Sequence, residues 1–150
     1  MIYEVKGNLL DSSCDYICHQ VNCQGVMGAG LAGQIRTHWP EVYEEYRTLC
    51  DEHKENKKEL LGWILLTETR DTDTKVLSLF AQEVYGRKGR YTSYDAFWMC
   101  LGGILKLLQP GDTIAFPKNI GCGLGGANWQ VIRTMIDEVL KNYDDYIYEL

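Results

Sequence analysis

Two glycine-rich segments, each lying between a strand-like apolar run and a helical pattern, restrict the fold of this chain more than any other feature. The first spans residues 21–33 (VNCQGVMGAGLAG) and the second spans residues 117–126 (PKNIGCGLGG). Glycine has the largest backbone entropy to lose on folding, so segments this rich in glycine make poor purely structural turns. Strand, glycine-rich loop and helix in succession, present twice, predict an α/β domain in which both loops lie at strand ends and meet in one crevice.

The rest of the chain also alternates between strand-like and helical patterns. Apolar runs bounded by turn residues predict strands over residues 2–5, 16–21, 61–67, 75–81, 113–116 and 146–150. Helical spacing of apolar residues predicts helices over residues 30–38, 40–49, 92–108 and 128–141, and places Phe97 and Trp98 in the core. No repeat or Pro/Gly/Ser-rich linker interrupts the alternation, so we expect residues 1–150 to form a single three-layer α/β domain.

Composition and charge exclude several classes of partner. The 150 residues are 45% hydrophobic and 24% charged, as in an ordinary globular domain. The sequence contains no apolar run of about 18 residues and no signal-peptide pattern, so we expect no membrane association and a cytoplasmic location. The net charge of −6 argues against a free nucleic-acid polymer as partner, because such binding depends on clustered Lys and Arg.

Six cysteines raise the question of a metal site. They include no CxxC pair, and the cysteines closest in sequence lie in a strand-like run that directs alternate side chains to opposite faces. Zinc requires ligands at tight local spacing, which this arrangement lacks. We therefore expect neither a metal nor a cofactor, and interpret the cysteines as reduced, mostly buried thiols.

The glycine-rich segments have the properties of phosphate-binding loops. Glycine lets the backbone approach a ligand, and the unpaired N–H groups at a helix start attract an anion. Two such loops suggest a diphosphate or a nucleotide, whereas the alternative is that glycine only relieves packing in a tight turn. Neither segment contains the Gly-Lys-Ser/Thr of a P-loop. A GxGxxG pattern occurs at residues 28–33, but no acidic residue follows at the expected distance, so a dinucleotide-binding dehydrogenase is disfavoured.

The order of these motifs resembles the macro-domain family. The resemblance is carried by residues 3–10 (YEVKGNLL), 19–23 (HQVNC), 27–32 (MGAGLA) and 120–124 (IGCGL), together with Pro117. It covers essentially the whole chain, and within the family it is most similar to the branch that includes the terminal ADP-ribose glycohydrolase and the yeast ADP-ribose 1″-phosphate phosphatase. It implies a mixed, mostly parallel sheet of about six strands with helices on both faces, and ADP-ribose or a derivative lying across the strand ends.

The same resemblance implies a set of ligand-binding residues. Those at the adenosine end are Gly7, Asn8 and Leu9. Those that hold one phosphate and the distal ribose are Met27, Gly28, Ala29, Gly30, Leu31 and Ala32. Those around the other phosphate are Pro117, Ile120, Gly121, Cys122, Gly123 and Leu124, and the set is completed by Gln20, Val21 and Gln82. Many macro domains carry Asp at the position of Asn8, whose side-chain oxygen can also accept a hydrogen bond from adenine; a turn-stabilising Asn is the alternative.

His19 and Asn22 are the candidate catalytic residues. His19 lies at the end of the second strand, where the yeast phosphatase also carries histidine, and an imidazole that titrates near neutral pH can position or protonate a phosphate or leaving oxygen. The alternative is a histidine satisfied within the sheet. Asn22 can orient the distal ribose or a water through its amide, or can instead hydrogen-bond the loop.

Two departures from the glycohydrolase branch bear on the reaction. That branch uses a lysine nucleophile and an acid, and the matching positions here are Gln82 and Gly125, which cannot perform those roles. Lys88 or Lys118 would substitute only if the loops fold differently. The expected function is hydrolysis of a group linked at the 1″ position, with three alternatives: a non-catalytic ADP-ribose reader, a substrate-assisted hydrolase of ADP-ribosylated macromolecules, and an interaction domain without a nucleotide. Residues expected to flank the cleft are Tyr85, Arg87, Tyr91 and Tyr94.

Overall fold

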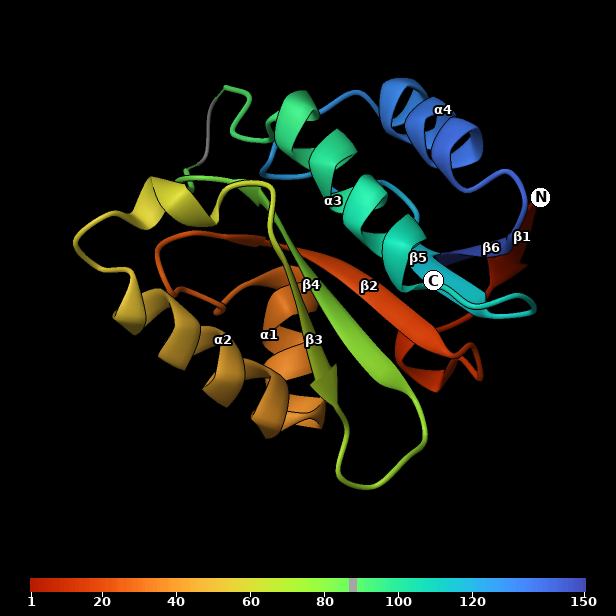
Figure 1. Cartoon of the computed structure of the whole chain (residues 1–150), viewed down its shortest axis with the longest axis horizontal. Coiled ribbons are helices and arrows are strands. Elements are labelled where there is room, and N and C mark those ends of the chain that lie inside the picture. The colour runs from red at the N-terminus through yellow and green to blue at the C-terminus, as the bar shows by residue number, and fades with distance from the viewer. Residues whose placement is uncertain (87–88) are drawn as a thin grey trace.

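A six-stranded mixed sheet forms the centre of the molecule (Figure 1). The computed structural model describes residues 1–86 and 89–150. The strands are β1 (Ile2–Lys6), β2 (Tyr16–Asn22), β3 (Ile64–Glu68), β4 (Lys75–Gln82), β5 (Thr113–Pro117) and β6 (Asp144–Glu149). They lie in the order β1-β6-β5-β2-β4-β3, and every neighbouring pair is parallel except β3 with β4. The predicted sheet of about six mostly parallel strands is confirmed.

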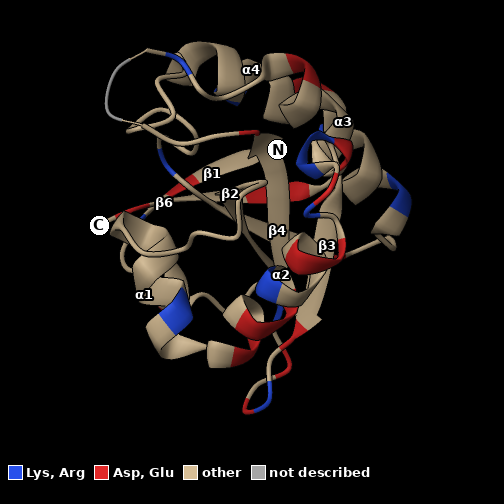
Figure 2. Ribbon diagram, turned by 90° about the vertical axis from the view of Figure 1, so that its left-hand side faces the viewer, with Lys and Arg blue, Asp and Glu red and all other residues tan. Residues whose placement is uncertain are grey.

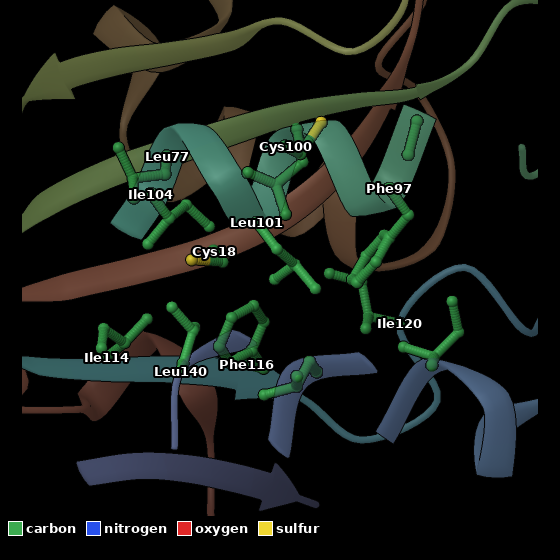
Figure 3. Packing of buried hydrophobic residues seen from close by; sticks show 14 of the residues in the cluster. Cys18, Leu77, Phe97, Cys100, Leu101, Ile104, Ile114, Phe116, Ile120 and Leu140 are labelled. Carbon is green, nitrogen blue, oxygen red and sulfur yellow. The ribbon is translucent and has the colours of Figure 1, made fainter. Parts of the chain in front are cut away.

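Two helices cover each face of the sheet, which makes three layers (Figure 2). One face packs against α1 (Gly30–His38) and α2 (Pro40–Glu52), and the other packs against α3 (Tyr94–Leu107) and α4 (Trp129–Val139). Figure 3 shows Phe97, Leu101 and Ile104 of α3 in the second of these cores. Two short 3₁₀ turns, η1 (Leu9–Asp11) and η2 (Lys57–Leu60), complete the elements, and no described helix is long and apolar enough to cross a membrane.

Strand β2 lies between β5 and β4 and supplies side chains to both cores. Ile17 and Val21 point to the face covered by α1 and α2, while Tyr16 and Cys18 point to the face covered by α3 and α4. This alternation follows from the two-residue period of a strand and explains why the run is apolar almost throughout. The carboxyl end of β2 is therefore flanked by the carboxyl ends of two parallel neighbours.

Several predicted boundaries are wrong, for local reasons. The third helix begins at Tyr94 because the Ser93 hydroxyl accepts a hydrogen bond from Ala96 N and caps it. The third strand begins at Ile64, after η2 and after Gly62 at a φ of +93°, a conformation that favours glycine. The last strand begins two residues earlier than expected, at Asp144. Trp98, expected in the core, is 47% exposed, because it lies on the outer face of α3.

Candidate functional site

A cavity of about 710 Å³ opens where β2, β4 and β5 end. The last residue of each of these strands, respectively Asn22, Gln82 and Pro117, lines it. Both glycine-rich segments also contribute, so the two loops meet in one crevice as the strand order requires. The residues that line the cavity are His19, Gln20, Val21, Asn22, Val26, Gly28, Ala29, Gly30, Leu31, Ala32, Gln82, Tyr85, Gly86, Pro117, Lys118, Asn119, Ile120, Gly121, Gly123, Leu124 and Gly125.

The first glycine-rich segment ends in an uncapped helix start. Ala29 is the N-cap residue of α1 and offers no side-chain hydrogen bond. Within the described residues, the N–H groups of Gly30, Leu31 and Ala32 have no acceptor, and the first amide of the helix to find one is Gly33, which donates to Ala29 O at 3.3 Å. All three free amides belong to residues that line the cavity. Unpaired N–H groups and the positive end of the helix dipole together favour an anion here.

The second glycine-rich segment uses some of its amides internally and leaves others free. Cys122 N donates to Asn119 O at 2.8 Å, and Ala127 N donates to Gly121 O at 2.9 Å. Asn119 has a φ of 65°, and Gly121 and Gly126 each have a φ of 74°, so the segment passes three times through the left-handed region. In the part of the chain that the structure describes, five cavity-lining residues of this segment have amides without an acceptor: Asn119, Gly121, Gly123, Leu124 and Gly125.

A side-chain network joins the ends of β2 and β4 beneath the cavity. Gln20 Nε2 donates to Gln82 Oε1 at 2.7 Å and to Thr92 Oγ1 at 2.8 Å. Gln82 Nε2 in turn donates to Val84 O at 2.9 Å. The Gln82 amide is therefore engaged at both its oxygen and its nitrogen, and Gln82 serves to hold the strand end and the following loop.

Asn22 organises the first loop. Its Oδ1 accepts hydrogen bonds from Gln24 N and from the Tyr46 hydroxyl, both at 2.9 Å, and its Nδ2 donates to Val26 O at 2.9 Å. Asn22 is 8% exposed and lines the cavity. Since Nδ2 carries two hydrogens, one remains for a ligand or water.

His19 lies in the floor of the cavity and is 1% exposed. Its Nε2 is 2.8 Å from the Ser78 hydroxyl, and its Nδ1 has no partner among the described residues. Burial lowers the pKa of His19 to about 4, because a charged imidazolium loses its hydration there. The expectation that His19 titrates near neutral pH is therefore wrong: the ring is uncharged at pH 7.

With this geometry in place, the comparison with known proteins decides the family. Residues 18–136 match the family described as Macro domain. This chain belongs to the macro-domain family. The resemblance stated from the sequence motifs is thereby confirmed.

Relatives and a solved structure agree with this assignment. An ADP-ribose 1″-phosphate phosphatase of Scheffersomyces stipitis is 34% identical over 96% of this chain and 95% of its own length. A DNA ADP-ribosyl glycohydrolase of Mycobacterium bovis is 26% identical over 97% of this chain, which spans only 40% of that longer protein. The solved structure of Thermosipho africanus DarTG in complex with ADP-ribose, 21% identical, matches with a TM-score of 0.81 over 99% of this chain and 42% of that chain, so it shares the fold.

Five of the predicted ligand-binding residues do not line the cavity of this macro domain. Met27 and Leu9, at 1% and 5% exposed, are part of the core under α1 and α2. Asn8 caps η1 by accepting a hydrogen bond from Leu10 N at 3.0 Å, as the turn-stabilising alternative has it. Gly7 continues the β1–β6 ladder by donating to Glu149 O, and the Cys122 thiol donates to Ile120 O. The remaining predicted residues all line the cavity.

The cavity also includes residues that were not among the predicted binding residues. Val26, Asn119 and Gly125 lie within the two glycine-rich segments, so counting every residue of each segment as a candidate would have found them, and Gly86 follows Tyr85. Lys118 lines the wall and forms an ion pair with Glu149 at 2.9 Å.

Of the residues expected to flank the cleft, one lines the cavity and two do not, and the fourth lies outside the described residues. Tyr85 lies at the rim and is 56% exposed, as expected of a flanking residue. Tyr91 and Tyr94 do not line the cavity, and the Tyr94 hydroxyl instead accepts a hydrogen bond from Asn128 N. Arg87 and Lys88 lie outside the described residues.

Gly125, which the resemblance is expected to place where the glycohydrolase branch has its acid, has no space for a side chain. A Cβ there would overlap Thr92 Oγ1 and would lie 2.6 Å from Gly121 O. Real Cβ atoms essentially never approach so closely, so an acidic residue at this position would require the loop to move. The glycine is therefore a steric requirement of this particular loop.

Proposed function

We propose that this macro domain binds ADP-ribose or a derivative in the cavity and hydrolyses a group linked at the 1″ position, as an ADP-ribose 1″-phosphate phosphatase does. One observation carries the proposal: amides without acceptors, from an uncapped helix start and from a glycine-rich loop, line a single cavity of about 710 Å³. Two sets of amide donors suit the two phosphates of a diphosphate ligand. Local dipoles can outweigh a net charge of −6 because the global field is screened by salt.

The choice of a phosphatase-like reaction is supported by the Scheffersomyces stipitis relative, which the chain matches along nearly all of both sequences. In such a reaction water oxygen bonds to phosphorus, the bond from phosphorus to the 1″ oxygen breaks, and that oxygen keeps the electron pair and takes up a proton. Because burial disfavours a charge on His19, the neutral ring suits a hydrogen bond to water or to the leaving oxygen better than acting as a cationic acid. Asn22, with one free N–H, is the candidate to orient water or the distal ribose.

Two alternatives use the same cavity. A non-catalytic reader or scavenger of ADP-ribose is favoured by Gln82 and Gly125, which occupy positions where a related branch carries its catalytic pair. A substrate-assisted hydrolase of ADP-ribosylated macromolecules is favoured by the similarity to a DNA ADP-ribosyl glycohydrolase. Lys and Arg are scattered over several elements (Figure 2), which argues against a long nucleic acid as the bound partner.

Ligand binding is tested by thermal unfolding with and without ADP-ribose, followed by calorimetric titration. We expect a clear rise in the melting temperature, since ligand at about 100 times its dissociation constant adds roughly 2.7 kcal/mol of stability. Absence of any shift or heat at millimolar ADP-ribose would remove the proposal and both alternatives together.

Turnover is tested by measuring phosphate release from ADP-ribose 1″-phosphate. We expect His19→Asn to reduce release by about tenfold or more, since a hydrogen bond to a charged group contributes about 1.5 kcal/mol or more. His53→Asn is the matched control, because His53 bonds Leu49 O at the end of α2 and does not line the cavity. Tight binding without release would favour the reader, and release undiminished in His19→Asn would remove His19 from the reaction.

We also propose a cytoplasmic location. All six cysteines are free thiols and five of them are buried. Thiols persist in this state in reducing compartments.

A further inference from the structure

Thr92 lies directly beneath the second glycine-rich segment, although it does not line the cavity. It stands between β4 and α3 and is 2% exposed. Its Oγ1 accepts a hydrogen bond from Gln20 Nε2 at 2.8 Å and donates one to Gly121 O at 2.8 Å. Its backbone N donates to Gly125 O at 3.0 Å, and a single β-bridge joins it to Gln82. One buried residue thus connects the ends of β2 and β4 to two points of the loop.

The loop depends on such external contacts because its own sequence provides little rigidity. Four of the six residues from Gly121 to Gly126 are glycine, and glycine has the widest choice of backbone conformations. The two carbonyls that Thr92 holds, of Gly121 and Gly125, bracket the segment whose free amides line the cavity. Fixing both ends of this segment fixes the directions of the N–H groups between them.

The packing around the hydroxyl is as restrictive as the hydrogen bonding. A Cβ on Gly121 would lie 3.1 Å from Thr92 Oγ1 and 3.3 Å from its Cγ2, and a Cβ on Gly125 would overlap Oγ1. The Thr92 hydroxyl therefore occupies the space that a side chain at Gly121 or Gly125 would need. Threonine and the two glycines form one unit, in which the hydroxyl satisfies buried groups of the loop and of β2.

We infer that Thr92 is a positioning residue that holds the amides of the second glycine-rich segment in their anion-binding arrangement. This inference rests on the proposed function, because it assigns Thr92 to the same site. The hydroxyl acts through Gly121 and touches no ligand. Loss of the hydroxyl leaves the Gly121 carbonyl with its hydrogen bond from Ala127 N alone and removes the link from the loop to Gln20, so this end of the segment is held less firmly before an anion arrives.

The test compares Thr92→Val, which keeps the shape and removes the hydroxyl, with Thr92→Ser, which keeps the hydroxyl. Calorimetry with ADP-ribose and with inorganic pyrophosphate measures affinity. The amide NMR shifts of Gly121, Gly123 and Gly125 on adding pyrophosphate report directly on the amides of the second glycine-rich segment. Thr67→Val is the matched control, since Thr67 is also fully buried, donates to Glu45 of α2 and does not line the cavity.

We expect Thr92→Val to lower the affinity for both ligands by about tenfold or more and to reduce the NMR shifts of the three glycine amides. The reason is that the substitution leaves buried hydrogen-bonding groups unpaired. Thr92→Ser and Thr67→Val should stay within about threefold of wild type. Equal loss in Thr92→Val and Thr67→Val, or wild-type affinity in Thr92→Val, would overturn the inference and leave the proposed function standing. If Thr92→Val does not fold, a tenfold loss in folded Thr92→Ser would overturn it. Wild-type protein that binds neither ligand would overturn both.

Discussion

At the scale of single residues, burial decides the charge state of His19. The ring is 1% exposed and its Nε2 bonds a serine that is itself fully buried, so protonation would place a cation in the core. Its pKa is about 4 in the folded state against about 6.5 when unfolded. A lowered pKa in the folded state means that the unfolded state takes up the proton first as the pH falls. The contribution of His19 to stability is therefore present above about pH 6.5 and is lost as the pH falls towards 4.

We predict that His19→Asn reduces the acid sensitivity of the fold. Between pH 6.5 and 4, the free energy of unfolding of wild type should fall more steeply than that of the variant, by up to about 1.4 kcal/mol per pH unit. Urea denaturation at several pH values in this range measures both slopes. Parallel slopes for the two proteins would mean that His19 is protonated as readily in the folded state as in the unfolded state.

A pair of glycines in one loop provides a second test at this scale. Gly125→Ala should destabilise the protein by about 1–3 kcal/mol, because the new Cβ overlaps Thr92 Oγ1 and the Gly121 carbonyl. Gly123→Ala is its matched control, since a Cβ there meets nothing within 4 Å. Thermal unfolding of both variants measures the difference. Equal melting temperatures would show that the loop adjusts to a side chain at 125.

At the scale of elements, the helices differ in how their first turns are satisfied. Asn128 caps α4 and Ser93 caps α3 through their side chains, whereas Ala29 leaves the start of α1 without a cap. An uncapped helix start is less stable in itself, since a capping side chain contributes about 1 kcal/mol. At α1 the missing cap leaves the amides facing the cavity available to a ligand anion.

This arrangement predicts opposite effects on stability and binding. Ala32→Asp places a carboxylate in the first turn of α1, where the helix dipole should stabilise the fold by about 0.3–1 kcal/mol. The same charge should weaken ADP-ribose binding by roughly tenfold or more, because it repels the phosphate. Val131→Asp, at the equivalent position of α4 and outside the cavity, should gain similar stability with unchanged affinity. Melting temperature and calorimetry report the two effects, and unchanged affinity in Ala32→Asp would place the phosphate elsewhere.

At the scale of the whole molecule, a carboxyl group of the core, that of Asp145, has no hydrogen-bond partner among the residues that the structure describes. Asp145 of β6 is 0% exposed, and neither of its oxygens has a hydrogen-bond partner within residues 1–86 and 89–150. Burial raises its pKa to about 8; the Met1 ammonium opposes this, and Asp144 and Asp137 reinforce it. The folded state therefore keeps a proton that the unfolded state releases above about pH 4. This favours the fold at low pH, and the benefit is lost as the pH rises through about 8.

We predict that Asp145→Asn changes the pH dependence of global stability. The free energy of unfolding of the variant, relative to wild type, should increase between pH 4 and 8 by up to about 1.4 kcal/mol per pH unit. Chemical denaturation at matched pH values measures this difference, in which the titrations common to both proteins cancel. A difference that does not change with pH would mean that the Asp145 carboxyl is ionised in the folded core.

Local patterns in the sequence predicted the three-layer fold, and the resemblance to the macro-domain family supplied most of the residues that line the cavity. Apolar periodicity sets which segments are strands or helices, and the glycine-rich segments at 21–33 and 117–126 mark where strand ends meet helices. The parallel order of β2, β4 and β5 then brings their ends together. The places of Asn8 and Leu9 were not predicted, because both depend on the 3₁₀ turn η1. Asn8 caps this turn, and Leu9 packs into the core.

The layers and the two glycine-rich loops could be inferred from the sequence, since backbone conformation and amphipathic period are properties of neighbouring residues, and the family followed from the resemblance of its motifs. Three features required the folded coordinates: the uncharged state of His19, the lack of space for an acid at position 125, and the Thr92 contacts that join β2, β4 and the second loop. Each of these features depends on contacts between residues that are far apart in the sequence, and local sequence patterns do not predict such contacts.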